Sequence, residues 1–487
     1  MSTAIWFIPF LVHHLGPSAY GLIPLAVTVT SYMTIMTQSV RSAVSRDLLY
    51  ALVGDGDDSP GAVFNTAFFA LLGITIPLAL VSLLLVGNLE SILSIPEGFE
   101  LSARHLFAMT CVAFLVSTIA SPFGASATAK HRLDLCNWIS ITAALARIVT
   151  VTIAFTILSP SLLIVGVGAL IAAAIESIGT IFTWKRLTPF LCVRASEFKP
   201  SILRRLLGTG AWTIIGQIGT LLLMSIDLLL VNRIFGPEDG GLFALALQWA
   251  LLLRLIANVM AGTFTPTITH AYATRASNLV KNTTVQSIKF VGLAIAFPIG
   301  MICGFSDSLL SIWLGIDFSE LSGLLILLTA PLIVQLPLTP IFALALAADR
   351  LRAICFSTLI LGIINPFIAW FLAVPLGWGM IGIGASSGAL YALRSFLIDL
   401  PLAEKIEKGT GKESTKALFL ATFVCAIIAI ISWIINKALS PDCWPEILFC
   451  ISAILAIACP SVYFAATNPE ERLAVKKLIR LPIASDN

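Results

Sequence analysis

Residues 62–86, AVFNTAFFALLGITIPLALVSLLLV, form an apolar run that contains no charged side chain. A helix that crosses the hydrocarbon core of a bilayer needs roughly 20 apolar residues. Similar runs occur at about 20–40, 104–126, 136–158, 161–183, 206–232, 241–265, 286–306, 321–348, 353–375, 379–399, 416–437 and 445–466. If the shorter apolar segment 4–15 is counted as a truncated first span, the sequence predicts about 14 transmembrane helices.

The composition agrees with a polytopic membrane protein. Of the 487 residues, 58% are hydrophobic and 11% are charged, whereas soluble domains carry about 25% charged residues. So few charges exclude a soluble enzyme, a disordered chain and a nucleic-acid-binding protein. The runs lack the strict alternation of a transmembrane β-barrel, and the nine cysteines form no metal-binding or cofactor-binding motif. We therefore predict an all-α polytopic membrane protein.

Lysine and arginine residues orient the chain. They concentrate in the loops that follow even-numbered spans, as at Lys185, Arg186, Arg204 and Arg205, whereas the opposite side is mainly acidic. Positively charged loops stay in the cytoplasm. The asymmetry predicts that both termini are cytoplasmic.

Two segments match at an offset of 220 residues: LVHHLGPSAYGLIPLA at 11–26 and VNRIFGPEDGGLFALA at 231–246. Six spans separate the copies, so we expect a parallel repeat of two six-helix lobes, 1–190 and 200–400. Two additional helices at 410–467 and a basic cytoplasmic tail at 468–487 follow. Because Met1 aligns with Leu221, inside the seventh span, we expect that the first helix is truncated and that the true start lies upstream.

The stretches FLVHHLGPSAYGLIPLAVTVTSYMTIMTQSVRSAVSR and LLLVNRIFGPEDGGLFALALQW resemble the oligosaccharide-lipid (O-antigen type) flippases. These belong to the multidrug/oligosaccharidyl-lipid/polysaccharide exporter superfamily. The resemblance implies two lobes around a central cavity lined mainly by helices 1, 2, 7 and 8. It also implies a non-enzymatic protein of the bacterial inner (cytoplasmic) membrane that transports undecaprenyl-diphosphate-linked oligosaccharide to the periplasmic leaflet for surface polysaccharides such as lipopolysaccharide.

Polar and charged side chains inside spans are the best candidates for a transport site, because they are costly in lipid and face protein or water. In the second span, one polar stripe recurs at helical spacing and comprises Thr30, Thr34, Thr37, Gln38, Arg41 and Ser45. The candidate substrate-cavity residues are Arg41, Arg254, Arg147, Asp227, Glu176, Gln38, Gln217, Gln248 and Asn258.

Guanidinium groups form charge-assisted hydrogen bonds with phosphate oxygens, so Arg41 and Arg254 are expected to hold a diphosphate. The amide side chains would replace the water that the sugar hydroxyls lose. Asp227 is a candidate site for a coupling ion, either H⁺ or Na⁺. The alternative is structural: Arg41 or Arg254 would neutralise Asp227, and Arg147 would neutralise Glu176.

Three other functions compete with this interpretation. A multidrug exporter or a lipid II flippase of the same superfamily would share the fold. A membrane-embedded glycan polymerase or ligase would need a long periplasmic loop, and none is predicted. The expected partners are the lipid-linked oligosaccharide, membrane lipids and the glycan polymerase machinery.

Overall fold

The computed structural model describes residues 2–53, 58–130, 132–208 and 211–466, and these residues form helices and short connections without any strand. Thirteen of the described helical segments are long and apolar enough to cross a membrane, and a shorter apolar helix covers Ile5–Leu15. The prediction of an all-α polytopic protein with about 14 helices is therefore confirmed.

One compact unit, called here the N-terminal unit, comprises Met1–Ala246 with Arg350–Leu390. It contains α1 (Ser2–Leu15), α2 (Pro17–Val53), α3 (Pro60–Gly87), α4 (Leu89–Ile92), α5 (Glu100–Ala129), α6 (Leu133–Ile157), α7 (Leu162–Leu187), α8 (Pro200–Gly208), α9 (Ala211–Met224), α10 (Ile226–Phe235) and α17 (Leu351–Ala373), with the short 3₁₀ turn Ala195–Glu197. It also holds the first part of α11 (Pro237–Ala273) and most of α18 (Gly379–Arg394).

The other compact unit, the C-terminal unit, comprises Leu247–Asp349 with Tyr391–Asn487. Besides the remainders of α11 and α18, it contains α12 (Ser277–Gly304), α13 (Ser306–Leu314), α14 (Ser322–Thr329), α15 (Leu332–Gln335), α16 (Pro340–Ala347), α19 (Leu400–Ile406), α20 (Thr410–Leu439) and α21 (Trp444–Ala466). Two 3₁₀ turns, Ile316–Leu321 and Leu336–Leu338, and a π-helical turn, Ser395–Asp399, lie between these helices. The lobe boundaries expected from the repeat stay a prediction, and the tail 468–487 lies outside the described residues.

The predicted span 321–348 is a broken rather than a continuous helix. Pro331 and Pro337 lie between α14, α15 and α16, at the two interruptions. Proline cannot donate a backbone hydrogen bond and clashes with the preceding turn. Local i→i−3 bonds, such as Ile333 N to Ala330 O at 3.2 Å, replace the regular ladder at these points. The two prolines therefore explain why hydropathy alone identifies one span where the structure has three short helices.

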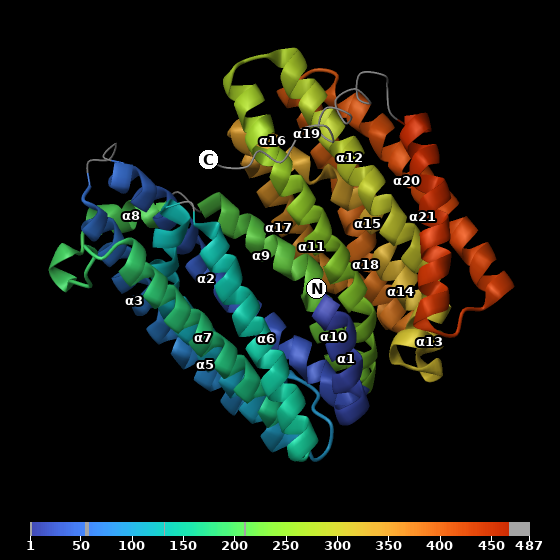
Figure 1. The fold of residues 1–487 in the computed structure, drawn as a ribbon, viewed down its shortest axis with the longest axis horizontal. Helices are drawn as coiled ribbons and strands as arrows, with labels where there is room; N and C mark the ends of the chain where they lie inside the picture. The colour runs from blue at the N-terminus through green and yellow to red at the C-terminus, as the bar shows by residue number, and fades with distance from the viewer. Residues whose placement is uncertain (1, 54–57, 131, 209–210, 467–487) are drawn as a thin grey trace. The chain divides into compact units, whose positions relative to one another are not determined.

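Helices α3, α5 and α7 lie side by side in the N-terminal unit (Figure 1), and aromatic rings fill the space between them. The ring centroids of Phe64 and Trp184 are 5.5 Å apart, and those of Phe123 and Trp184 are 4.9 Å apart. Such pairs stabilise a core beyond their buried area. This cluster fixes the positions of α5 and α7, which carry part of the candidate site.

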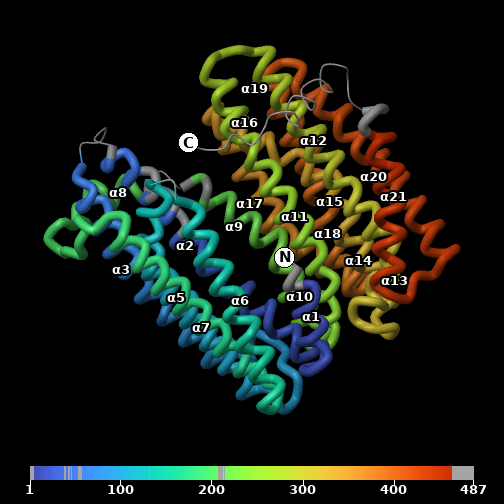
Figure 2. Tube along the Cα trace, viewed as in Figure 1, coloured from blue at the N-terminus to red at the C-terminus, as the bar shows by residue number. Residues whose placement is uncertain are grey.

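In the C-terminal unit, glycines let α12 and α20 approach closely, and Figure 2 shows the two traces running together. A Cβ atom at Gly300 would lie 2.8 Å from the carbonyl oxygen of Cys425, and one at Gly304 would lie 2.3 Å from Cβ of Ser432. Close approach through small residues is the usual way that membrane helices associate, because lipid gives no hydrophobic driving force between them. Helix α20, which contains the predicted span 416–437, is thus packed tightly into this unit.

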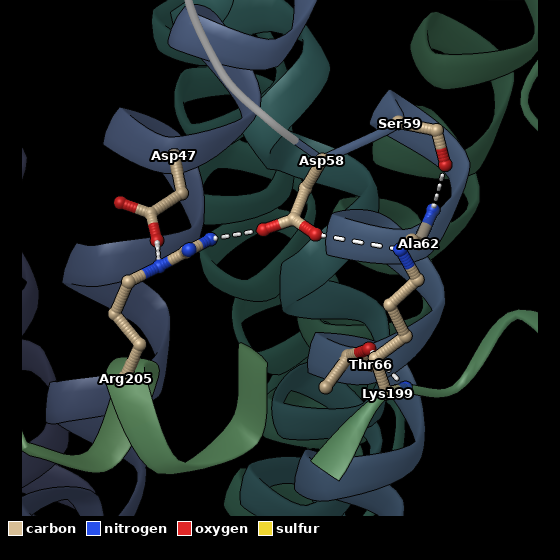
Figure 3. A network of polar contacts seen from close by, with 7 residues as sticks. All are labelled: Asp47, Asp58, Ser59, Ala62, Thr66, Lys199 and Arg205. Atoms are coloured by element: carbon tan, nitrogen blue, oxygen red, sulfur yellow. Dashed lines mark hydrogen bonds and ion pairs between the residues drawn. The ribbon is translucent and has the colours of Figure 1, made fainter. Parts of the chain in front are cut away.

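A polar network ties the segment after α7 to the ends of α2 and α3 (Figure 3). The Arg205 guanidinium donates to Asp47 at 3.1 Å and contacts Asp58 at 3.0 Å, and Nζ of Lys199 lies 3.4 Å from the other oxygen of Asp58. The backbone N–H of Lys199 donates to the Thr66 hydroxyl at 3.0 Å. The segment between α7 and α9, which carries Lys199 and Arg205, is therefore docked on α2 and α3.

The two copies of the repeated motif have the same local structure. Gly16 (φ +79°) ends α1 and precedes Pro17 of α2, and Gly236 (φ +98°) ends α10 and precedes Pro237 of α11. Glycine adopts positive φ without strain, and proline is favoured at the first position of a helix. The helices that follow, α2 and α11, each have 37 residues. The local equivalence inferred from the sequence is confirmed in this helix–Gly–Pro–helix pattern.

The glycine contacts give a first prediction. Gly304→Val inserts a side chain where no space exists, and overpacking costs about 1–3 kcal/mol. We expect a lower melting temperature in detergent and less monodisperse protein on size-exclusion chromatography. Gly73→Val is the matched control, since a Cβ atom at Gly73 meets nothing within 4 Å. Equal melting temperatures for the two variants would contradict the packing described for α12 and α20.

Candidate functional site

A polar cavity of about 470 Å³ lies in the N-terminal unit, between α2, α5, α6 and α7. Both charged residues of its lining, Arg41 and Glu176, are among the candidates predicted from the sequence. The rest of the polar lining is mainly hydroxyl groups, from Ser117, Ser121, Thr128, Ser140, Ser177, Thr180 and Thr183. Such a lining offers hydrogen-bond donors and acceptors to a hydroxyl-rich ligand.

Helical spacing explains how these side chains come to share one space. On α5 the lining residues Ser117, Ser121, Gly124 and Thr128 recur at steps of three or four, and Glu176, Thr180 and Thr183 do the same on α7. Residues at this spacing lie on one face of a helix. The polar faces of α5 and α7 therefore turn toward the same cavity, because the two helices are held side by side by the aromatic cluster.

Arg41 and Glu176 bring opposite charges to the cavity from α2 and α7. Both side chains are exposed to the cavity rather than packed away, and Glu176 lies near enough to act electrostatically on Arg41. The two residues that the sequence placed in spans two and six are thus brought together. An arginine retains its charge even in a protein interior, so the cavity presents a permanent cation to a ligand.

Arg147 lies on the same face of α6 as the lining residue Ser140, but nearer the middle of the helix. The two are seven residues, or two turns, apart, which corresponds to about 10 Å along the axis. The Arg147 backbone and side chain pack against Gly168 of α7, and its Nε is buried without a hydrogen-bond partner among the described residues. In the described part of the chain no ion pair joins Arg147 to Glu176, so the structural pairing considered for these two residues is not observed.

Asp227 is buried, 2% exposed, at the start of α10, directly after an irregularity at Ser225 that separates α10 from α9. Nδ2 of Asn365, on α17, donates to Asp227 at 2.8 Å, and Oδ1 of Asn365 lies 2.9 Å from the Ser386 hydroxyl of α18. The Tyr32 hydroxyl donates to the carbonyl of Leu221, one turn before Ser225, at 3.3 Å. A broken span with a buried carboxylate is a frequent form of ion site in transporters.

In the C-terminal unit, Arg254 of α11 is half-buried and belongs to a second polar network. Its Nη1 donates to Oε1 of Gln335 at 2.7 Å. The Tyr391 ring lies beneath two guanidinium groups, with Cζ of Arg254 at 5.1 Å and Cζ of Arg394 at 5.6 Å from the ring centroid. Arg394 in turn donates to Asp399 at 3.2 Å. Cation–π contacts at these distances stabilise a guanidinium in a partly desolvated place.

The turn Ser395–Asp399 that links Arg394 to Asp399 is π-helical. Pro401 lies two residues after this turn. Because proline has no N–H, the regular helical bond to the carbonyl of Leu397 is missing. Widened turns of this kind are often found at functional sites. Here the widened turn accompanies the contact between two charged side chains that are five residues apart.

The remaining predicted residues occupy varied positions. Gln217 of α9 and Asn258 of α11 are exposed, Gln248 of α11 is half-buried, and the side chain of Gln38 lies outside the described residues. The threonines of the α2 stripe are satisfied by their own helix, since Thr30, Thr34 and Thr37 each donate to a carbonyl three or four residues earlier. These hydroxyl donors are therefore used within α2 itself.

Sequence reasoning missed several members of these networks, namely Tyr32, Gln335, Asn365, Ser386, Tyr391, Arg394 and Asp399. One signal was available: Arg394 and Asp399 both lie in the last predicted turns of an apolar span, five residues apart. Asn365 and Ser386 lie in apolar helices that carry other small polar residues, such as Thr358 and Ser387, so nothing local distinguishes them from interhelical packing residues. Among the described residues no group of three His, Cys, Asp or Glu side chains could hold a metal ion.

Comparison with known proteins gives a consistent picture. Residues 3–271 match the family model described as polysaccharide biosynthesis protein. A curated relative, the uncharacterized membrane protein EpsK of Bacillus subtilis (strain 168), is 27% identical over 485 residues, which cover 97% of this chain and 94% of the relative.

Solved structures of low sequence identity share the fold. The inward-facing structure of a multidrug resistance MATE family transporter of the MOP superfamily has a TM-score of 0.65 and 15% identity, and covers 86% of this chain and 96% of that chain. The lipid II flippase MurJ, in an inward closed conformation, has a TM-score of 0.52 and 12% identity, and covers 90% of this chain and 98% of that chain. At such identities the likeness concerns the fold alone.

The Asp227 cluster gives a second prediction. Asn365→Leu removes one donor from a buried carboxylate, which costs about 1–3 kcal/mol. We expect a measurable loss of thermal stability in detergent, with partial recovery in Asn365→Gln. Ser387→Ala, which removes only a 3.3 Å bond to a carbonyl of its own helix, is the control. An Asn365→Leu protein as stable as the control would show that the bond to Asp227 does not contribute.

Proposed function

Because the chain belongs to the polysaccharide biosynthesis protein family, we propose that it is a membrane transporter that flips a lipid-linked oligosaccharide across the bilayer. The proposed substrate is an oligosaccharide on undecaprenyl diphosphate, moved from the cytoplasmic to the periplasmic leaflet of a bacterial inner membrane. Both termini would be cytoplasmic, as the distribution of lysine and arginine indicates. The observation that carries this proposal is the polar, arginine-containing cavity among helices that are long and apolar enough to cross a membrane.

The substrate poses two physical problems that the cavity residues can address. A diphosphate is anionic, and burying it in hydrocarbon without partners is prohibitive. Guanidinium groups such as that of Arg41 offer bidentate, charge-assisted hydrogen bonds to phosphate oxygens. The sugar hydroxyls lose water when they leave the cytoplasm, and the hydroxyl side chains of α5, α6 and α7 can replace it.

Two further arginines extend this role. Arg147, two turns beyond Ser140 on α6, offers a second contact for the anion deeper in the membrane. Arg254, braced by Gln335 and the Tyr391 ring, offers one in the C-terminal unit. Gln38, Gln217, Gln248 and Asn258 supply amide groups to the sugars. The lipid chain stays in the bilayer while the headgroup moves.

Asp227 is the proposed coupling residue. A buried carboxylate can bind a proton or contact a cation, and Asn365 donates to Asp227 and accepts from Ser386. The irregularity at Ser225 allows α9 and α10 to change their relative angle when the charge of Asp227 changes. Coupling to an ion gradient would make the flipping directional.

A multidrug exporter is the second candidate, and the similarity of fold to a MATE transporter favours it. An exporter of cationic drugs would need carboxylates to dominate its binding residues. The charged candidates here are three arginines, at positions 41, 147 and 254, and two carboxylates, Glu176 and Asp227. This excess of positive charge favours an anionic substrate. A flippase for lipid II remains within the proposed class, because its substrate is also a lipid diphosphate carrying sugars.

A third prediction tests the arginines. Arg41→Ala or Arg254→Ala should reduce flipping of a fluorescent lipid-diphosphate oligosaccharide in proteoliposomes roughly ten- to hundredfold, because a charged hydrogen bond is worth about 1.5–3 kcal/mol. Arg41→Lys should recover part of the rate, since it keeps the charge and loses the bidentate geometry. Arg104→Ala, which breaks only an exposed ion pair with Glu90, is the control and should transport normally. Full rates in both alanine variants at normal abundance would refute the anion-binding role.

A fourth prediction tests the coupling. Asp227→Asn keeps the shape of the side chain and can still accept from Asn365, but it cannot carry a charge. We expect flipping in this variant to be insensitive to an imposed pH or Na⁺ gradient, whereas the unmodified protein is accelerated by one of them. The same acceleration in Asp227→Asn would exclude this residue as the coupling site.

A further inference from the structure

The segment that joins α7 to α8, residues 188–199 and called here the linker, is fixed to the helices beneath it. Nδ2 of Asn65, a buried side chain of α3, donates to the carbonyl of Cys192 and to Oε2 of Glu197, each at 3.0 Å. Oδ1 of Asn65 accepts from the N–H of Arg194 at 2.8 Å. One amide side chain therefore fixes the path of the linker, and the side chains along it point in definite directions.

Three apolar side chains in the middle of the linker differ in burial. Leu191 is 3% exposed and packs into the apolar core that α2, α3 and α5 share. Phe190 is 61% exposed and Val193 is 43% exposed, although the backbone between them is held by Asn65. Because the linker is docked, these two side chains do not turn inward. Exposed apolar surface of this kind marks a contact with a membrane or a protein.

The linker begins where α7 leaves the membrane. Helix α7, Leu162–Leu187, is long and apolar enough to span a bilayer. Ile178 and Phe182, 67% and 66% exposed, lie on one face of this helix, and the exposed Lys185 follows on the same face. An apolar face that ends in a lysine indicates the passage from hydrocarbon to headgroups. Phe190, three residues beyond the end of α7, therefore lies at the level of the headgroups.

Basic side chains flank the exposed apolar pair. Lys185 and Arg186 are exposed in the last turn of α7, and among the described residues no ion pair involves either of them. The Arg194 side chain is 65% exposed, and its contact with Glu197 is a long one of 3.8 Å. Cationic groups beside exposed apolar side chains complement an anionic lipid, which offers phosphate oxygens above acyl chains.

We propose that one surface, composed of Lys185, Arg186, Phe190, Val193 and Arg194, is a binding site for anionic phospholipids of the leaflet at which α7 ends. Phe190 and Val193 enter the boundary between headgroups and acyl chains, and the three cations bind phosphate groups. Lipid then covers the linker from outside while Asn65 holds it from inside, so bound lipid stabilises the docked linker. This inference goes beyond the proposed function and does not depend on which substrate is carried.

A lipid titration of the purified full chain in detergent tests the charges. Dioleoyl phosphatidylglycerol should raise the melting temperature, because a ligand of the folded state stabilises it, and dioleoyl phosphatidylcholine should not. Each basic residue near an anionic surface contributes about fivefold to affinity. The triple variant Lys185→Gln, Arg186→Gln, Arg194→Gln should therefore need about a hundredfold more phosphatidylglycerol for the same stabilisation.

The matched control removes the same charge from the C-terminal unit, at the exposed Lys405, Lys408 and Lys416. Their triple replacement by Gln should respond to phosphatidylglycerol as the unmodified protein does. Equal responses of the two triple variants, or equal effects of the two lipids on the unmodified protein, would overturn the proposal.

The exposed Cys192 allows a second test inside a bilayer, since it lies between Phe190 and Val193. An environment-sensitive fluorophore is attached to it in a background where Cys443 and Cys459 are serine. In nanodiscs of equal parts phosphatidylcholine and phosphatidylglycerol, we expect emission at shorter wavelength than in phosphatidylcholine alone, and quenching by spin-labelled lipid. Replacing Phe190 and Val193 by Ser should abolish both effects. Emission typical of a water-exposed dye in both kinds of nanodisc would refute lipid binding and favour a protein partner for this surface.

Discussion

The hydrocarbon core of a membrane offers no water to a polar group, and this constraint governs the whole structure. Backbone N–H and C=O groups form their hydrogen bonds within helices. Charged or amide side chains inside spans must contact other polar groups or water. In this protein several of them gather in three places: the cavity with Arg41 and Glu176, the Asp227–Asn365–Ser386 cluster, and the network around Tyr391. Such groups are expensive to keep in a membrane, and the transport role proposed above is built on these three groups.

Glycine determines how closely the helices of each unit approach one another. Along α9 and α17, a Cβ atom at Gly219 would lie 2.5 Å from the backbone of Leu359, which leaves no freedom between these helices beside the Asp227 cluster. At Gly21 and Gly241 the same close approach joins the two copies of the repeat.

Much of the fold could be predicted from the sequence because hydropathy depends on composition over about 20 residues. Hydropathy predicts the spans, the match at an offset of 220 residues predicts the helix–Gly–Pro–helix repeat, and charges inside spans single out Arg41 and Glu176. The interruption at Ser225 could not be predicted, since serine is ordinary in a membrane helix, and the span 316–347 divides at prolines that hydropathy ignores. The partnership of Asp227 with Asn365 joins residues 138 positions apart, and no local pattern encodes such a contact. The assignments of Gln38 and of the basic tail stay predictions, because the Gln38 side chain and the tail lie outside what the structure describes.

The central claim is that the cavity between α2, α5, α6 and α7 is hydrated and accepts an anionic sugar headgroup. The most direct test is the reaction rate of Ser121→Cys, a lining position, with a membrane-impermeant thiol reagent in proteoliposomes. Ile76→Cys, 71% exposed in an apolar stretch of α3, serves as the lipid-facing reference. The account predicts that Ser121→Cys reacts, that Ile76→Cys does not, and that a saturating lipid-diphosphate oligosaccharide slows the former at least tenfold. A thiol at position 121 that is inert, or that reacts equally fast with and without the oligosaccharide, would contradict it.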